Sequence, residues 1–209
     1  MPKIDAPEKL FFSLLGKKLT DDELCDIFPV AKAELDGHDT EHGVIKIELN
    51  DTNRPDLWSP AGVARALKTY STGEIPYYDF FSTKDEEKPS DGRMIIDDES
   101  AKGIRDFSIG FGCRGVTVDD DLLTNLIQSQ EKLCFNFGRK RKTIAMGIYR
   151  SELINYPVHY AAVDPDKTKF VPLGMTEELS LREICSKHPK GKEYGYIVSS
   201  FDKFPYLYD

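Results

Sequence analysis

Apolar residues recur at helical and strand spacing over the first 75 residues, which predicts a small α/β unit. The pattern predicts helices over residues 9–15, 21–28 and 60–70, and a pair of strands over residues 30–35 and 44–49. Gly16 is a usual helix terminator, and Thr20 with Glu23 forms a capping box for the second helix. Pro60 stands at the first position of the third helix, where proline is favoured.

Proline, glycine and charged residues interrupt this periodicity between residues 71 and 91, which indicates a linker. Beyond the linker the pattern predicts strands over residues 94–96, 107–118, 142–149, 158–163, 194–198 and 204–209, and helices over residues 119–137 and 179–188. Three aspartates suit the positive end of the longer helix, and Gly138 marks its end. Thr176 or Ser180 caps the shorter helix.

These elements predict an α/β (α+β) fold in two domains. We expect an N-terminal α/β domain over residues 1–75, a linker over 76–92, and a mixed-sheet domain with a long helix over 93–209. The last predicted strand stands where its partner strand would be missing, so we expect the second domain to be incomplete and the chain to be a piece of a longer protein.

Composition places the chain among ordinary globular proteins. It has 209 residues, of which 40% are hydrophobic and 31% charged, and no apolar run long enough for a membrane helix. We therefore expect a soluble, cytoplasmic protein without a membrane partner. Four scattered cysteines predict reduced, mostly buried thiols, and no metal site is expected. The net charge of −8 argues against a protein that coats nucleic acid indiscriminately, although residues 139–142 form a local basic run.

Two short motifs match catalytic or cofactor signatures by letter only. Residues 110–115 match G-x-G-x-x-G, but a strand pattern follows instead of a helix, which favours glycines in a bent strand over a dinucleotide site. Residues 38–42 match H-x-x-E-H, but flanking glycines favour a polar hairpin loop over a helical metal site.

Two longer stretches are more informative. Residues 51–65 read DTNRPDLWSPAGVAR, which from its residues alone is an elaborate helix cap with a mainly architectural role, because Pro55 fixes φ and Asp56 or Ser59 can cap the helix that follows. Residues 128–148 read QSQEKLCFNFGRKRKTIAMGI, a helix that ends in a basic run.

Together these stretches resemble the β subunit of phenylalanyl-tRNA synthetase of the archaeal and eukaryotic type. The family has Asn-Arg-Pro-Asp-Leu followed by Gly, an aliphatic residue, Ala and Arg, and a Gln-Glu-Lys helix that leads through Gly-Arg into a Gly-Ile strand of its editing domain. Smaller pieces agree in order along residues 1–209, at Ile104-Arg105, Phe170, Pro172-Leu173-Gly174, Leu179, Glu183-Ile184 and residues 191–195.

The resemblance implies a role in charging tRNA(Phe). In the family, the β subunit pairs with an α subunit that carries the ATP and phenylalanine site in an α2β2 heterotetramer. ATP and Mg²⁺ serve the holoenzyme, and no cofactor is implied within this region. The region resembles the editing domain, which hydrolyses tyrosine wrongly attached to tRNA(Phe). Such a second site is useful because an apolar pocket rejects an added hydroxyl only about 10²-fold.

The resemblance also suggests site residues. Pro205-Tyr206-Leu207-Tyr208-Asp209 matches a strand whose leucine lines the editing pocket, so Leu207 is a pocket candidate. Gln128 and Glu131 share a helix face and are further candidates, with a polar helix surface as the alternative. The basic residues Arg139, Lys140, Arg141 and Lys142 are candidates for contact with tRNA phosphates, with a solvated basic face as the alternative.

Three hypotheses remain open at this point. The chain is an editing-domain fragment of a synthetase, a noncatalytic module for tRNA docking or subunit contact, or a free-standing relative that edits in trans. No side chain has the pattern of a dedicated nucleophile, so an editing reaction would use a positioned water. The family's pocket continues in a Ser-Met-Pro-Pro strand that this sequence lacks, so we expect the fragment alone to be poorly active.

Overall fold

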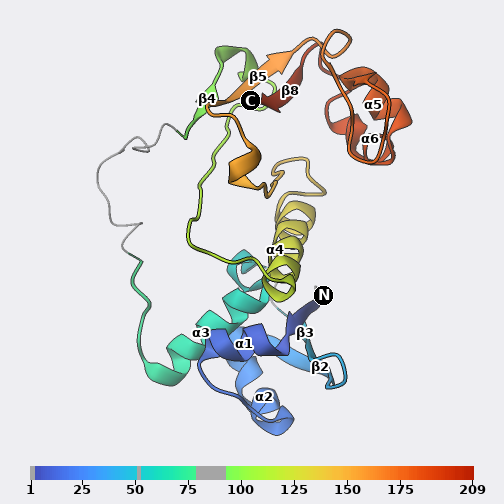
Figure 1. Cartoon of the computed structure of the whole chain (residues 1–209). Helices are drawn as coiled ribbons and strands as arrows, with labels where there is room; N and C mark the ends of the chain where they lie inside the picture. Colours follow the sequence, from blue (N-terminus) through green and yellow to red (C-terminus); the bar gives the residue numbers. More distant parts are fainter. Residues whose placement is uncertain (1–2, 51–52, 79–92) are drawn as a thin grey trace. The chain divides into compact units, whose positions relative to one another are not determined.

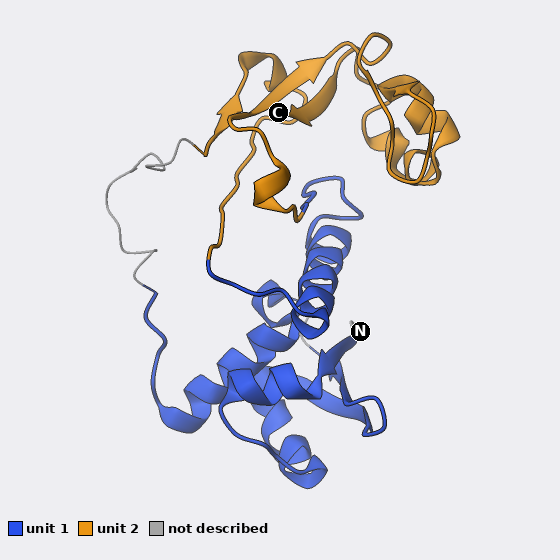
Figure 2. Ribbon diagram, viewed as in Figure 1, with its two compact units in different colours: residues 1–82, 115–147 blue, residues 83–114, 148–209 orange. Residues whose placement is uncertain are grey.

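The computed structural model describes residues 3–50, 53–78 and 93–209, which fall into two compact units. Residues 1–82 and 115–147 form the first unit, and residues 83–114 and 148–209 form the second (Figure 2). The predicted domain bounds, 1–75 and 93–209, stay a prediction, but the long helix groups with the N-terminal residues. Asp51 and Thr52 of the motif, and residues 79–92 of the predicted linker, lie outside the described residues.

The first unit is a three-stranded antiparallel sheet packed against helices (Figure 1). Its strands lie in the order β1-β3-β2, and its described strands and α-helices are β1 (Lys3–Pro7), α1 (Glu8–Leu15), α2 (Asp21–Ile27), β2 (Ala33–Asp39), β3 (Val44–Leu49), α3 (Pro60–Thr72) and α4 (Asp120–Lys132). Short 3-10 turns span Phe28–Ala31 and Pro55–Leu57, and a π-helical turn, Leu133–Phe137, extends α4.

The core of this unit follows the predicted periodicities. Alternate residues of β3, Ile45, Ile47 and Leu49, are fully buried, as the strand pattern predicted. They pack with the buried faces of α1 and α3, and each large aliphatic side chain contributes roughly 1.5–3 kcal/mol to the core. The predicted caps are confirmed: Gly16 ends α1 in the left-handed region, and Thr20 and Glu23 form the capping box of α2.

One predicted strand in this unit begins later than expected. The prediction placed a strand over residues 30–35, but Val30 and Ala31 belong to the 3-10 turn Phe28–Ala31. Pro29 stands at the start of that turn, where its fixed φ favours a helical turn, and Lys32 then reverses the chain with φ 55°. The strand therefore runs over Ala33–Asp39.

The predicted strand over residues 142–149 is absent, because this segment is held beside α4 instead. The Gln130 side chain donates to the Met146 carbonyl (2.6 Å), and the Met146 N–H donates to Cys134 Sγ (3.2 Å). Gly138 allows a close approach here, since a Cβ on it would lie 2.7 Å from the Ile144 carbonyl oxygen. Hydrogen bonds with side chains of a helix thus hold the segment for which the alternation of apolar and polar residues had predicted a strand.

The second unit has a small mixed sheet and a helical pair. The sheet order is β4-β5-β8, with β4 parallel and β8 antiparallel to β5. Its described strands and α-helices are β4 (Ile95–Asp97), β5 (Val158–Val163), β6 (Lys169–Phe170), β7 (Leu179–Ser180), α5 (Leu181–Lys187), α6 (Pro189–Tyr194) and β8 (Phe204–Tyr208). The 3-10 turns are Glu99–Ala101, Ser151–Leu153 and Gly195–Ile197. The predicted final strand is β8, and it pairs with β5, which corrects the expectation that its partner strand would be missing.

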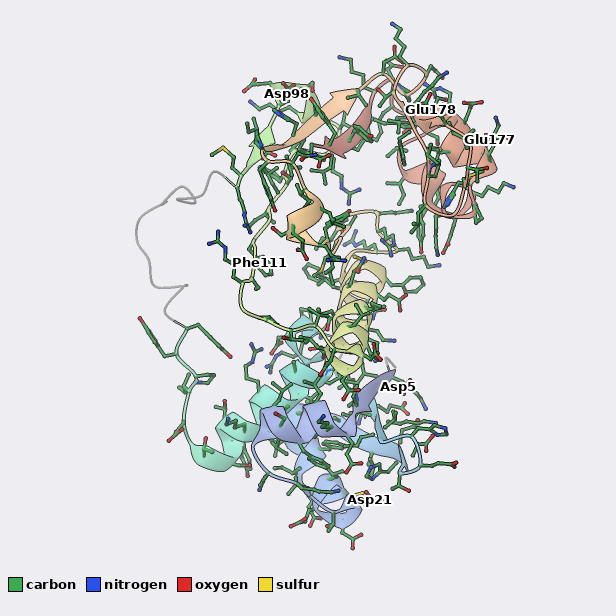
Figure 3. All side chains as sticks on the ribbon, in the orientation of Figure 1. Asp5, Asp21, Asp98, Phe111, Glu177 and Glu178 are labelled. Atoms are coloured by element: carbon green, nitrogen blue, oxygen red, sulfur yellow. The ribbon has the colours of Figure 1, made fainter. Side chains whose placement is uncertain are left out.

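Two further strand predictions in the chain are wrong. Residues 107–118 contain no strand, and Phe107, Ile109 and Phe111 are almost fully exposed, so their alternation buries nothing in the described structure (Figure 3). Residues 194–198 are the end of α6 and a 3-10 turn. The helix forms because Pro189 begins it and because Gly191 lets it cross α5, where a Cβ would lie 1.8 Å from the Ile184 carbonyl oxygen.

The start of helix α5 and the exposure of the cysteines differ from the prediction. Ser180 is the cap of α5, so the helix starts at Leu181 rather than at residue 179. Cys134 is buried and Cys185 half-buried, but Cys25 and Cys113 are exposed, which corrects the expectation of mostly buried thiols; all four are free. No helix in the described parts of the chain is long and apolar enough to cross a membrane.

Candidate functional site

The motif after residue 52 organises the start of α3. Arg54 binds both carboxylate oxygens of Asp56 (2.9 and 2.8 Å), and Arg65 lies 3.7 Å from the same carboxylate. The Arg54 hydrogen bonds, and then the charges of both arginines, hold the pKa of Asp56 below its usual range. Ser59 caps the helix by accepting a hydrogen bond from the Gly62 N–H (3.1 Å). The cap expected from the sequence is therefore Ser59, with Asp56 in an ion-pair network.

Gly62 explains why this motif includes a glycine. A Cβ on Gly62 would lie 1.7 Å from the Asp56 carbonyl oxygen, well inside van der Waals contact. The 3-10 turn Pro55–Leu57 can approach α3 this closely only because residue 62 has no side chain. The interactions of the motif are thus mainly architectural, in agreement with the reading from its residues.

Gln128 joins α4 to the sheet of the first unit. Its side-chain Oε1 accepts a hydrogen bond from the Asp5 N–H (2.9 Å), and its Nε2 donates one to the Asp5 carbonyl (2.7 Å). Asp5 is labelled in Figure 3. Strand β1 is at the edge of the sheet, so the amide satisfies main-chain groups that have no strand partner there. Glu131, one turn along α4, is exposed. Both belong to the first unit and Leu207 to the second, so the structure does not bring these candidates together within one unit.

The basic run forms an unusual turn at the end of α4. Arg139, Lys140 and Arg141 all have positive φ, at 49°, 57° and 67°. Each non-glycine residue in this region costs on the order of 1–2 kcal/mol. In return, their N–H groups bond to the carbonyls of Asn136, Phe135 and Cys134 at 2.8–3.1 Å, which would otherwise be left unsatisfied at the helix end. We call residues 139–142 the basic turn.

A cavity of about 750 Å³ opens beside the basic turn. Its lining combines aromatic, aliphatic and polar side chains with one cation: Trp58, Asn136, Phe137, Arg139, Thr143 and Ile144. All six residues belong to the first unit. Trp58 is only 4% exposed, and its indole N–H has no hydrogen-bond partner in the described structure. Arg139 could be predicted from the sequence, but the cavity could not, because Trp58 is far from the basic run along the chain.

Leu207 lies on β8 in the second unit, on one face of the β4-β5-β8 sheet. The strand register places Leu207 opposite Tyr160, and Tyr160 beside Asp97 of β4, so the three side chains project from the same face. Leu207 is 47% exposed, whereas Tyr160 is buried and donates its hydroxyl hydrogen to the Arg105 carbonyl (2.8 Å). Burial raises the pKa of Tyr160.

The sheet face that carries Leu207 also carries a polar group that the sequence did not single out. Ser108 donates a hydrogen bond to the Asp97 carboxylate, which is exposed. The segment that carries Ser108 passes close to β4. A Cβ on Gly110 would lie only 2.7 Å from the Ile95 side chain, so the absence of a side chain at Gly110 permits this approach. Only the strand register puts Asp97 and Leu207 on either side of Tyr160 on one face, so no local pattern in the sequence could have linked them.

The two letter-level motifs have other roles in the structure. The first histidine of H-x-x-E-H, His38, lies in β2 with its Nδ1 2.6 Å from Asp21, and the second, His42, lies in the turn to β3 beside Asp39. The predicted hairpin is thus confirmed, but His38 and Asp39 belong to its first strand rather than to the loop. Residues 110–115 precede no helix directly, and the predicted bent strand is absent there. Among the residues described, no group of three His, Cys, Asp or Glu side chains could hold a metal ion.

Comparison with known proteins gives a consistent result. The phenylalanine–tRNA ligase beta subunit of Borrelia garinii subsp. bavariensis is 52% identical over 209 residues, which cover 100% of this chain and 37% of that protein. That of Borreliella burgdorferi is 51% identical with the same coverage. A crystal structure of an N-terminal fragment of the phenylalanyl-tRNA synthetase beta-subunit from Pyrococcus horikoshii matches with a TM-score of 0.84 and 37% identity, over 100% of this chain and 58% of that one. The chain corresponds to the N-terminal region of phenylalanine–tRNA ligase β subunits.

The correspondence covers the whole sequence but only part of its relatives. The chain spans a little over a third, 37%, of the curated β subunits it matches. No protein-family model matches the chain. The residues that resemble the β-subunit signature, from Arg54 to Arg65, are those that hold α3 against its preceding turn. In this chain, the contacts of these residues are therefore architectural.

Proposed function

We propose that this chain acts as the N-terminal part of the β subunit of a phenylalanine–tRNA ligase. In that role it would work with an α subunit, in an α2β2 assembly in the cytoplasm, to charge tRNA(Phe) with phenylalanine at the expense of ATP. The observation that carries the proposal is the match to two β subunits at 51–52% identity along the entire chain. ATP and Mg²⁺ would bind the α subunit, and we assign no residue of this chain to them.

We infer further that the second unit takes part in removing tyrosine from mischarged tRNA(Phe). In this hydrolysis water attacks the ester carbonyl carbon, the bond to the ribose oxygen breaks, and that oxygen takes a proton, which releases tyrosine and tRNA. Leu207 offers an apolar wall for the aromatic ring. The Asp97 carboxylate, held by Ser108 on the same sheet face, offers an acceptor for the tyrosine hydroxyl or for a water.

A polar partner for the hydroxyl is what separates tyrosine from phenylalanine. When phenylalanine occupies a site built to hydrogen-bond a hydroxyl, the polar groups of that site stay unpaired, and discrimination reaches 10⁴–10⁵ in well-studied cases, on the order of magnitude needed for proofreading. An exposed carboxylate and a half-exposed leucine on one sheet face, two strands and so roughly 10 Å apart, can contact opposite ends of one aromatic side chain.

The test is deacylation of Tyr-tRNA(Phe) by a chimeric β subunit, purified with its α subunit. The chimera carries residues 1–209 of this chain in place of the matching region of the Borreliella burgdorferi protein. Leu207→Ala should reduce the rate of deacylation by about tenfold, because a few methylenes in an apolar pocket are worth roughly 1–3 kcal/mol. Leu173→Ala is the matched control, since Leu173 is an exposed leucine outside the sheet of the same unit. Equal rates for both variants would remove Leu207 from the site.

A noncatalytic role in docking tRNA is the second candidate function. The basic turn favours it, because four consecutive cations stand on a chain whose net charge is −8. A docking module would bind tRNA(Phe) in a salt-dependent way yet leave Tyr-tRNA(Phe) intact, so the same deacylation assay separates the two candidates. A relative that edits in trans would deacylate without the α subunit.

A further inference from the structure

Three independent features meet at the end of α4. The helix widens into a π turn, an arrangement that often marks a functional site. After Gly138, the residues Arg139, Lys140 and Arg141 have strained, left-handed backbone angles, and such strain is often concentrated at binding sites. The cavity beside them is lined by the half-exposed Phe137 ring, the Arg139 side chain and the edge of the buried Trp58.

We propose that this cavity takes one unstacked nucleobase of a single-stranded RNA, while the basic turn holds the flanking phosphates. The inference rests on the tRNA-docking role proposed above for the basic turn, and it adds a pocket that recognises a base. Proteins that bind single-stranded RNA combine these two elements, a cationic track for the backbone and aromatic rings for the bases.

The lining suits a base better than an apolar side chain. The Phe137 ring is 54% exposed and offers a face for stacking, and Ile144 adds an apolar wall. The polar lining groups include the Arg139 guanidinium, which only donates hydrogen bonds, and the Asn136 amide, which can both donate and accept. They match the carbonyl and ring-nitrogen acceptors on the edge of a base, and arginine in particular pairs with two such acceptors of guanine.

The volume and the position of the charges agree with this assignment. A cavity of about 750 Å³ lies within the range of small-molecule sites and leaves room for a base with its water. Lys140 lies over the neighbouring Phe135 ring at 5.7 Å rather than lining the cavity, and Arg139 alone of the basic turn lines it. The turn therefore presents cations outside the cavity for phosphates and one cation within it for a base.

The experiment compares a short single-stranded RNA with an oligomer of the same length built from abasic phosphodiester units. Dissociation constants are measured for the 209-residue chain by fluorescence anisotropy of the labelled oligomers at fixed ionic strength. Phe137→Ala and Phe135→Ala form a matched pair, because both rings lie in the π turn and are 54% and 52% exposed, but only Phe137 lines the cavity. Far-UV circular dichroism confirms that each variant is folded.

The wild-type chain should bind the base-containing RNA more tightly than the abasic oligomer by roughly 5- to 150-fold, the range for one stacked base. Phe137→Ala should lose most of this preference, and Phe135→Ala should keep it. Lys140→Ala should weaken both oligomers equally, whereas Arg139→Ala should also reduce the preference for bases. Emission from Trp58, the sole tryptophan, should change only with the base-containing RNA.

Equal affinity of the wild-type chain for the two oligomers would overturn the inference, as would equal behaviour of Phe137→Ala and Phe135→Ala. A change in Trp58 emission on adding the α subunit, with no binding of RNA, would mean that a protein segment fills the cavity and would also overturn it. Neither result touches the proposed role as part of a β subunit, which fails if the chimeric enzyme does not charge tRNA(Phe). The editing role fails separately, if the enzyme charges tRNA(Phe) but does not deacylate Tyr-tRNA(Phe).

Discussion

The contact between Gly62 and the preceding turn gives the sharpest stability prediction. In Gly62→Ala the new Cβ would start 1.7 Å from the Asp56 carbonyl oxygen, so α3 and the turn Pro55–Leu57 must separate by more than an ångström. Overpacking of this kind costs roughly 1–3 kcal/mol, and occasionally more. Alanine would regain about 0.8–1.0 kcal/mol through its higher helix propensity. A backbone atom is the obstacle, so we expect the upper end of the cost and a net destabilisation of about 2 kcal/mol.

The measurement is urea unfolding followed by the emission of Trp58. Because Trp58 is the sole tryptophan and lies in the core beside Gly62, its emission reports the first unit specifically. With a urea dependence of about 1–3 kcal/mol per molar, the midpoint should fall by roughly 1 M. Gly37→Ala is the control in the same unit, because a Cβ there would meet only the Lys46 side chain at an ordinary 3.9 Å.

A midpoint for Gly62→Ala equal to that of Gly37→Ala would refute the reasoning. It would show that the turn can move away from α3 at no cost, and the glycine would then need another explanation. The ion pair of Arg65 with Asp56 would lose its basis as well, since Arg65 lies on α3 and reaches that carboxylate only while the turn lies against the helix.

Three further predictions follow from single contacts. Gln128→Ala should destabilise the first unit by about 1 kcal/mol in the same urea assay, because it removes two hydrogen bonds to Asp5. The control Glu131→Ala, at an exposed neighbour, should change the free energy of unfolding by about 0.5 kcal/mol at most. Equal effects would contradict the conclusion that Gln128 stabilises the edge strand β1. The hydrogen bonds from Lys187 and Ser180 lower the pKa of Glu183 from 4.5 to about 2. The ionised Glu183 should therefore stabilise the fold fully above pH 4.5, and this stabilisation should be lost as the pH falls towards 2. Thermal melts of Glu183→Gln should lack this part of the pH dependence. Lys140→Ala and Arg141→Ala should each lower the log–log salt slope of tRNA(Phe) binding by roughly 0.7–0.9, while Lys17→Ala, an exposed lysine of the same unit, should leave it unchanged; unaltered slopes for the first two variants would remove these residues from the phosphate contacts.

Elements with strong local signals were predictable from the sequence. The capping box at Thr20 and the alternation along β3 need only neighbouring residues, and both are confirmed. The α/β fold class and the resemblance to the β subunit are also confirmed. Local pattern failed where a segment is held by side chains from elsewhere: alternation over residues 142–149 predicted a strand, but Gln130 and Cys134 hold Met146 beside α4.

The candidate site was predictable only in part, for a related reason. The basic turn and Leu207 could be named because they lie in continuous stretches that resemble the family. The cavity beside Arg139 brings in Trp58, which is distant in sequence, and Asp97 joins Leu207 only through the register of three strands. The left-handed turn was not predictable either, because arginine and lysine rarely adopt positive φ and no residue type there signals it.

The most direct test of the account is the selectivity of hydrolysis. Purified Tyr-tRNA(Phe) and Phe-tRNA(Phe) are incubated separately with the chimeric enzyme that carries residues 1–209 of this chain, and the release of each amino acid is followed over time without ATP. We predict rapid loss of tyrosine and retention of phenylalanine. Hydrolysis of both at the same rate, or of neither by an enzyme that still charges tRNA(Phe), would contradict the proposal that this region belongs to an editing site.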